Sequence, residues 1–276
     1  MKYLNANKLL INGTKTSYLL FKPKGVKSEI VTETVKLCGK EIEKVSHARF
    51  LGVMIDDKLE FNEHFKKIKK KIQEANRALM CTRYTLNFKA KLLFYNSFIK
   101  SHLEYCSIVY LDKMIKKQMK TLLTLQKQAV RLIFCARKNS GKLFKLAKII
   151  PVTELYNLEA TRFMFKYNNE ISCNLQPKAI FDLIFKKNNV KPRNTRATTD
   201  PNRIKIPCEY KKDNCLYKLI DTWNKSKTEF KMAGNDWSLN NMIKNDTLNK
   251  IEVCEQKNCE LCKFDEKRNF SQYMNA

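Results

Sequence analysis

The sequence contains little glycine and little proline, with six of each in 276 residues. Both residues mark turns, so their scarcity favours long helices over a turn-rich sheet protein. The sequence holds no run of about eighteen apolar residues, the length that a membrane span requires. The opening stretch, MKYLNANKLLINGTKT, lacks the apolar core and the small-residue cleavage site of a signal peptide.

Acidic residues are scarce beside basic ones: 27 Asp and Glu stand against 54 Lys and Arg, a net charge of +27. The apolar fraction of 43% is still enough for a packed core, which argues against wholesale disorder. The length fits one large or two small domains. Most of the ten cysteines, such as Cys81, Cys106 and Cys135, lie in apolar stretches. That usage predicts reduced thiols and an intracellular protein of the cytoplasm or nucleus.

The basic charge is concentrated in blocks. Residues 113–148 carry eleven Lys or Arg and no acidic residue, while Leu122, Leu125, Ala129 and Leu132 recur there at helical spacing. This pattern predicts a packed helix with a cationic outer face, for which a phosphate backbone is the simplest partner. The candidate contacts on that face are Lys116, Lys117, Lys120, Lys127 and Arg131. The alternative is a Lys-rich background whose charges are only solvated.

The first sixty residues predict short strands. Expected strands cover residues 8–11 and 17–21 around Asn12-Gly13, residues 29–37 and 41–45 around Gly39-Lys40, and residues 49–55, a run broken by Gly52. From Asn62 the apolar period changes to that of a helix. Further helices are expected at residues 89–110, 113–137, 142–149, 152–167 and 216–223. From about Phe230 the polar end is expected to be poorly ordered.

The expected fold class is therefore α+β and mainly α. A small β region spans residues 1–60, a helical bundle residues 61–170, and a loop-rich basic arm with a poorly ordered tail residues 171–276. Residues 186–212 of that arm carry nine basic residues against Asp200 and Glu209.

Four motifs occur in an order and spacing that resemble one family. They are KYLNANKLLINGTKTSYLLF at residues 2–21, HARFLGVMIDDKLEFNEHF at 47–65, YNSFIKSHLEYCSIVY at 95–110 and LLTLQKQAVRLI at 122–133. They are similar to segments of the reverse transcriptases of non-LTR retrotransposons of the jockey and chicken-repeat type. The short stretches NTR at 194–196 and TWN at 222–224 extend the resemblance.

The resemblance implies the end of a polymerase palm, a thumb and the region beyond. In that family the catalytic aspartates precede the segment where this sequence begins. The expectation is a truncated, catalytically inactive protein without a cofactor. Its thumb-like part would bind RNA and DNA template–primer duplex non-specifically, chiefly through phosphates. One alternative is a domesticated, non-enzymatic module for nucleic-acid binding or interaction. A second alternative, in which the basic amphipathic helices bind a membrane surface, has less support than nucleic-acid binding, because the apolar faces of these helices are needed for a core.

Two groups of residues carry the expected contacts. By the resemblance, Phe50, Leu51 and Gly52 correspond to the primer grip, since glycine in a strand allows close approach of another backbone. The alternative is a buried strand with a bulge. The second group consists of Lys66, Lys67, Lys69, Lys70 and Lys71. These lysines would follow the phosphates of a duplex as a thumb helix does. The alternative is a helix face that is only solvated.

No catalytic residue and no metal site is predicted. Asp56-Asp57 looks like a metal-binding pair but follows the primer-grip strand, so a role in a turn or a helix cap is expected. Cys254, Cys259 and Cys262 form C-x4-C-x2-C, a candidate for zinc. A structural zinc site needs four ligands, so Cys208 or Cys215 would have to complete it. Free thiols are the alternative.

Overall fold

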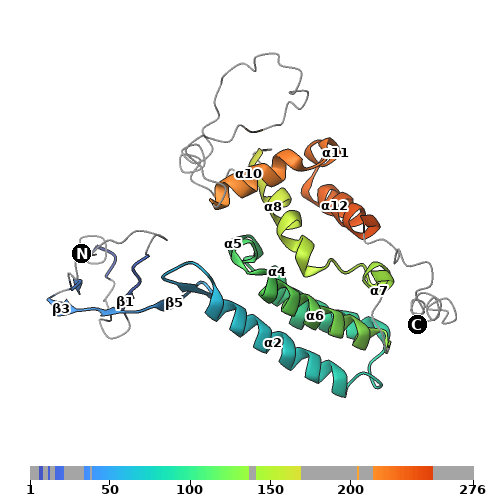
Figure 1. Cartoon of the computed structure of the whole chain (residues 1–276), viewed down its shortest axis with the longest axis horizontal. Helices are drawn as coiled ribbons and strands as arrows, with labels where there is room; N and C mark the ends of the chain where they lie inside the picture. The colour runs from blue at the N-terminus through green and yellow to red at the C-terminus, as the bar shows by residue number, and fades with distance from the viewer. Residues whose placement is uncertain are drawn as a thin grey trace, which may run out of the picture.

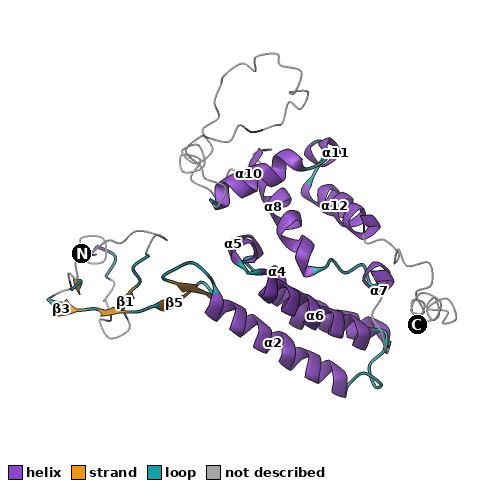
Figure 2. Cartoon of the chain, in the orientation of Figure 1, coloured by secondary structure: helices purple, strands orange, loops and turns teal. Residues whose placement is uncertain are grey.

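The computed structural model describes residues 6–8, 12, 16–21, 34–37, 39–136, 141–168, 204 and 214–250. Small N-terminal sheets are followed by helices, so the fold is α+β and mainly α, which confirms the predicted class (Figure 2). No helix in the described part of the chain combines the length and the apolarity needed to cross a membrane.

The strands form short pairs beside the beginning of the helical body (Figure 1). Strand β1 (Ser17–Tyr18) pairs in parallel with β4 (Glu43–Lys44), and β2 (Lys36–Leu37) pairs antiparallel with β3 (Lys40–Glu41). Gly39 lies in the β2–β3 turn at a φ of 78°, so the predicted hairpin at this position is confirmed.

The next hairpin corrects the prediction for residues 49–55. The predicted single strand is instead two antiparallel strands, β5 (His47–Phe50) and β6 (Val53–Asp56). Leu51 and Gly52 form the turn between them, both with positive φ. Val53 is the one residue of this hairpin that is buried, so a single apolar side chain anchors the hairpin to the core.

Two long basic helices form one layer of the body. Helix α2 (Asn62–Cys81) buries Ile68, Ile72 and Leu79, and helix α6 (Lys116–Ile133) buries Leu122, Ala129 and Ile133. They lie side by side and run in the same direction (Figure 2). Two hydrogen bonds fix their register: Gln118 Nε2 donates to Asn62 Oδ1 over 2.8 Å near the start of both helices, and Asn76 Nδ2 donates to the Leu125 carbonyl over 3.0 Å further along.

The segment between them is broken where the sequence predicted one helix over residues 89–110. The structure has α3 (Phe88–Tyr95), a π-helical turn η2 (Asn96–Lys100), α4 (Ser101–Glu104), α5 (Ser107–Tyr110) and a 3₁₀ turn η3 (Leu111–Lys113). The chain leaves helical geometry at Tyr105 with ψ 116° and at Cys106 with φ 53°. The prediction of a single helix is therefore wrong. The chain turns at these two residues, and Tyr110 beyond the turn is buried.

The second layer is built around helix α8 (Val152–Asn168), which lies between α6 and the C-terminal helices (Figure 1). Short helix α7 (Gly141–Leu146) precedes it. Gln126, which is 1% exposed, joins the layers: its Nε2 donates to Tyr95 Oη and to the Ile150 carbonyl, and its Oε1 accepts from Val152 N, all within 2.9 Å. The fully buried Trp223 on α10 (Cys215–Lys225) packs in the same core.

The C-terminal part corrects another expectation. The sequence predicted poor order from about Phe230, but α11 (Thr228–Lys231) and α12 (Asp236–Lys250) follow α10 and lie against the body. Leu239 and Ile243, one helical turn apart on α12, are buried in the core. Many Asn and Lys residues surround these apolar positions in the sequence, so the sequence pattern does not indicate a buried helix face.

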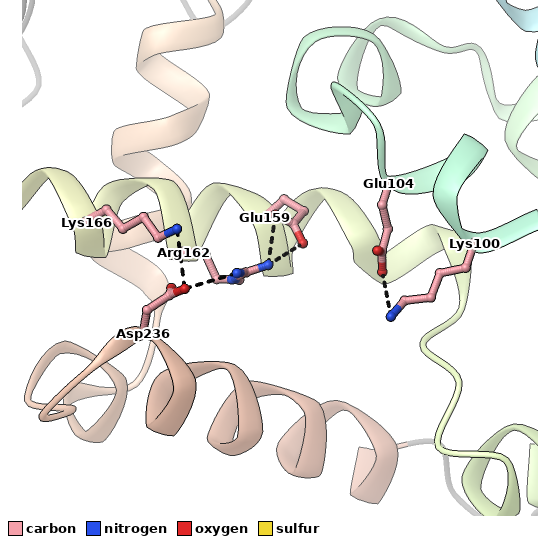
Figure 3. A network of polar contacts seen from close by, with 6 residues as sticks. All are labelled: Lys100, Glu104, Glu159, Arg162, Lys166 and Asp236. Atoms are coloured by element: carbon pink, nitrogen blue, oxygen red, sulfur yellow. Dashed lines mark hydrogen bonds and ion pairs between the residues drawn. The ribbon is translucent and has the colours of Figure 1, made fainter. Parts of the chain in front are cut away.

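Ion pairs hold α12 against α8 (Figure 3). Asp236 Oδ2, at the start of α12, accepts from Arg162 Nη2 over 3.1 Å and lies 3.3 Å from Lys166 Nζ. Arg162 also pairs with Glu159 one turn earlier on α8 over 3.1 Å. Nearby, Lys100 and Glu104 form their own pair over 3.5 Å.

Candidate nucleic-acid interface

Helix α6 presents a straight stripe of cations to solvent. Lys117, Lys120 and Lys127 are exposed and Arg131 is half-buried, on the side opposite Leu122 and Ala129. The steps between these positions are those that keep side chains on one helical face. From Lys117 to Arg131 the stripe extends over about 21 Å at 1.5 Å per residue. Lys116 is exposed at the beginning of the helix.

Helix α2 adds a second row beside the first. Lys66, Lys70 and Arg77 are exposed on the side away from Ile68 and Ile72. Because α2 and α6 run in the same direction and bury their apolar faces in one core, their outer faces lie next to each other. We call this surface the two-helix face. It consists of Lys66, Lys70, Arg77, Lys117, Lys120, Lys127 and Arg131.

Few acidic groups neutralise the two-helix face. Glu63 on α2 pairs with Lys66 over 2.6 Å, and the hydrogen bond from Lys66 lowers the pKa of the Glu63 carboxyl. Glu74 is the other acidic residue of α2, and α6 contains none. The face therefore keeps a clear excess of positive charge.

The structure divides the five lysines of the predicted α2 cluster. Lys66 and Lys70 belong to the two-helix face, whereas Lys69 is half-buried, seven residues before Asn76 on the side that meets α6. Lys67 and Lys71 lie near His102, whose pKa is lowered by burial first and then by these two ammonium groups. The cluster is thus distributed around the helix and does not form a single patch.

The predicted primer-grip residues form the exposed tip of the β5–β6 hairpin. Phe50 is 63% exposed and Leu51 is 74% exposed, so the alternative of a buried strand with a bulge is wrong. The tip is nevertheless held in place: the Tyr105 hydroxyl donates to the Leu51 carbonyl, and Lys67 Nζ donates to the Gly52 carbonyl over 3.4 Å. An apolar tip thus lies beside one cation of α2, Lys67.

Asp56 has the turn and capping role that its position predicted. Its Oδ1 accepts from Glu60 N over 2.7 Å, and its Oδ2 accepts from Asn62 N, the first residue of α2, over 3.2 Å. The described residues contain no group of His, Cys, Asp and Glu side chains that could hold a metal ion. Cys254, Cys259, Cys262 and Cys208 lie outside the described residues, and Cys215 is an exposed free thiol.

Two residues of this surface were not among the predicted contacts. Arg77 lies seven residues after Lys70, two turns along the same face, and that spacing could have identified it. Tyr105 comes to the hairpin tip only because the chain breaks after α4, a change that no local pattern marks.

Comparisons of the chain with protein-family models, with curated proteins and with solved structures found no match.

Proposed function

We propose that this chain binds nucleic-acid duplexes without sequence preference, through the two-helix face and the neighbouring hairpin tip. We further propose that it derives from the thumb end of a non-LTR reverse transcriptase. The order of the four motifs supports that origin. The observation that carries the binding proposal is the pair of adjacent cationic rows on α2 and α6, in which α6 contains no acidic residue.

The dimensions of the face suit a phosphate backbone. A duplex segment of about 21 Å carries roughly twelve phosphates, at one charge per 1.7 Å. The seven cations of the face can neutralise only part of these, which predicts modest affinity. Lys and Arg contacts to phosphate carry no sequence information, so binding should be indifferent to base order.

The hairpin tip adds a different kind of contact. Phe50 and Leu51 are exposed apolar side chains beside Lys67, and the bonds from Tyr105 and Lys67 hold their backbone in place. Aromatic side chains next to cations favour stacking with bases at a strand end. The tip would therefore contact the end of a duplex while the two-helix face follows its phosphates.

A charge-matched pair of variants tests the proposal. The first replaces Lys117, Lys120 and Lys127 on the two-helix face by Gln, and the control replaces the exposed Lys44, Lys89 and Lys145 by Gln. Each removes three charges, so the net charge is equal in both. Fluorescence anisotropy on a mixed-sequence duplex should show a salt slope reduced by roughly 2.7 in the first variant, at 0.9 per phosphate contact. The control should keep the slope of the unaltered chain. Equal slopes in the two variants would reject the two-helix face as the interface.

A further inference from the structure

A buried lysine and an exposed cysteine meet at the far end of the two long helices. Lys91 on α3 is only 6% exposed, and its Nζ donates to Cys135 Sγ over 3.3 Å. Cys135 lies two residues after the end of α6, and its backbone has a φ of 50°. Cys135 is exposed at the surface, whereas Lys91 reaches its sulfur from a buried position.

The surrounding contacts hold the two groups together. Phe88, one turn before Lys91, packs its ring against that of Phe134, the neighbour of Cys135, with centroids 5.1 Å apart. Cys135 Sγ also lies 3.6 Å from the Arg83 carbonyl in the loop after α2. A buried amine usually has a carboxylate partner. Among the described residues the structure gives Lys91 no such ion pair and places the sulfur against its nitrogen instead.

We propose that Lys91 and Cys135 form an oxidation-dependent covalent cross-link between α3 and the end of α6. This modification site is separate from the proposed nucleic-acid interface. The oxidant is a peroxide. In the first step the Cys135 thiol gives its proton to solvent and the sulfur attacks one peroxide oxygen; an S–O bond forms, the O–O bond breaks, and the leaving hydroxide takes up a proton, so that sulfenic acid and water result. The sulfur is oxidised and the peroxide is reduced.

In the second step the Lys91 nitrogen attacks the sulfenic sulfur. An N–S bond forms, the S–O bond breaks, and the leaving hydroxide takes a proton from the nitrogen to give water. The product is a sulfenamide, and the protein has lost two hydrogen atoms in total. A dithiol reductant reverses the reaction: one of its sulfurs attacks Cys135 Sγ, the N–S bond breaks and the nitrogen takes a proton, and its second thiol then releases Cys135 as a thiol while the reductant becomes a disulfide.

Peptide mapping of the full chain tests the cross-link. The chain is treated with hydrogen peroxide, free thiols are blocked with N-ethylmaleimide, and the tryptic digest is analysed by tandem mass spectrometry. We expect residues 90–100 joined to residues 132–137 at the summed mass less two hydrogens, and we expect dithiothreitol to separate them. The Lys91→Arg variant should lose the joined peptide, and the matched variant at the exposed neighbour, Lys89→Arg, should keep it.

A sulfenic-acid trap supplies a second readout that does not depend on the joined peptide. Dimedone present during oxidation should label Cys135 severalfold more in Lys91→Arg than in the unaltered chain, because the internal amine no longer competes for the sulfenic acid. Circular dichroism of both lysine variants should match that of the unaltered chain, which shows that they fold. The proposal fails if Cys135 remains a free thiol under doses that oxidise Cys215, or if it is recovered as a disulfide with Cys81. Equal dimedone labelling in the two proteins would also overturn it.

Discussion

Gly52 combines a backbone requirement with a tight contact. Its φ is 87°, a region that side-chain-bearing residues rarely adopt, and a Cβ there would lie 3.3 Å from Tyr105 Cε1. We predict that Gly52→Ala lowers the free energy of unfolding by about 1–2 kcal/mol from the backbone alone, with a further loss from the contact. Gly39→Ala is the matched control, because Gly39 has a φ of 78° and open space around its missing Cβ. Urea denaturation should show the greater loss for Gly52→Ala. If the two variants lose the same stability, the Tyr105 contact contributes nothing.

His64 should make stability depend on pH. Burial first, and Lys67 second, lower the pKa of His64 from 6.5 to about 4. Its ring packs edge-on against Tyr110, and its Nδ1 faces the Met54 amide over 3.5 Å. Because the folded pKa lies below the unfolded value, the unfolded chain binds the proton first as the pH falls. The contribution of neutral His64 to the free energy of unfolding is thus fully present above pH 6.5. It is lost as the pH falls toward and through about 4.

Thermal melting from pH 7 to pH 4 measures this dependence. We predict that His64→Phe, which has no titrating ring, loses less stability over the range than the unaltered chain. The exposed residue His47, replaced by Gln, serves as control and should follow the unaltered chain. Parallel curves for the His64 variant and the unaltered chain would show that His64 does not titrate in this way.

At the scale of elements, the docking of α12 depends on the ion pairs of Asp236. Removing its carboxylate leaves Arg162, 26% exposed in its side chain, without its partner on α12. We predict that Asp236→Ala lowers the free energy of unfolding by about 1–3 kcal/mol. The control Asp221→Ala breaks an exposed pair with Lys225 on a single helix and should cost under about 1 kcal/mol. The double variant Asp236→Ala, Arg162→Gln should lose less free energy of unfolding than the two single variants lose together. If chemical denaturation shows that the two losses add, Asp236 and Arg162 do not interact directly.

The sequence predicted elements well where apolar residues repeat over several turns. Helix α2 begins at Asn62 as expected, because its buried face repeats through the sequence from that residue. Helix α8 covers the predicted range to within a residue, because Pro151 marks its beginning. The break after α4 was missed, since it depends on the backbone at Tyr105 and Cys106 and on no turn residue. Helix α12 was missed because its buried apolar residues, Leu239, Ile243 and Leu248, are separated by Asn, Lys and other polar residues.

The candidate site shows the same division. The α6 stripe follows from helical spacing alone, so all of its predicted cations are placed on the outer face or at its edge. The distribution of the α2 lysines around their helix does not follow from spacing alone. It depends on which side of α2 meets α6, and the hydrogen bonds of Asn76 and Gln118 across the helix pair fix that side. The exposure of Phe50 and Leu51 likewise depends on a turn at which Leu51, a residue without special turn preference, has a φ of 44°.

At the scale of the whole molecule, the net charge of +27 is the dominant feature. Charge of one sign repels itself in a compact state, and a polyanion that covers the two-helix face relieves part of that repulsion. Binding should therefore be electrostatic in origin and should weaken steeply as salt screens and competes for the phosphates.

The most direct test is the affinity of the full chain for duplexes across a salt series. Fluorescence anisotropy on two duplexes of equal length and unrelated sequence should give the same affinity for both. The logarithm of the association constant should fall linearly with the logarithm of salt concentration, by roughly 0.9 for each phosphate neutralised. Affinity that does not change with salt, or a strong preference for one of the two sequences, would contradict the proposal that this chain holds duplexes through their phosphates.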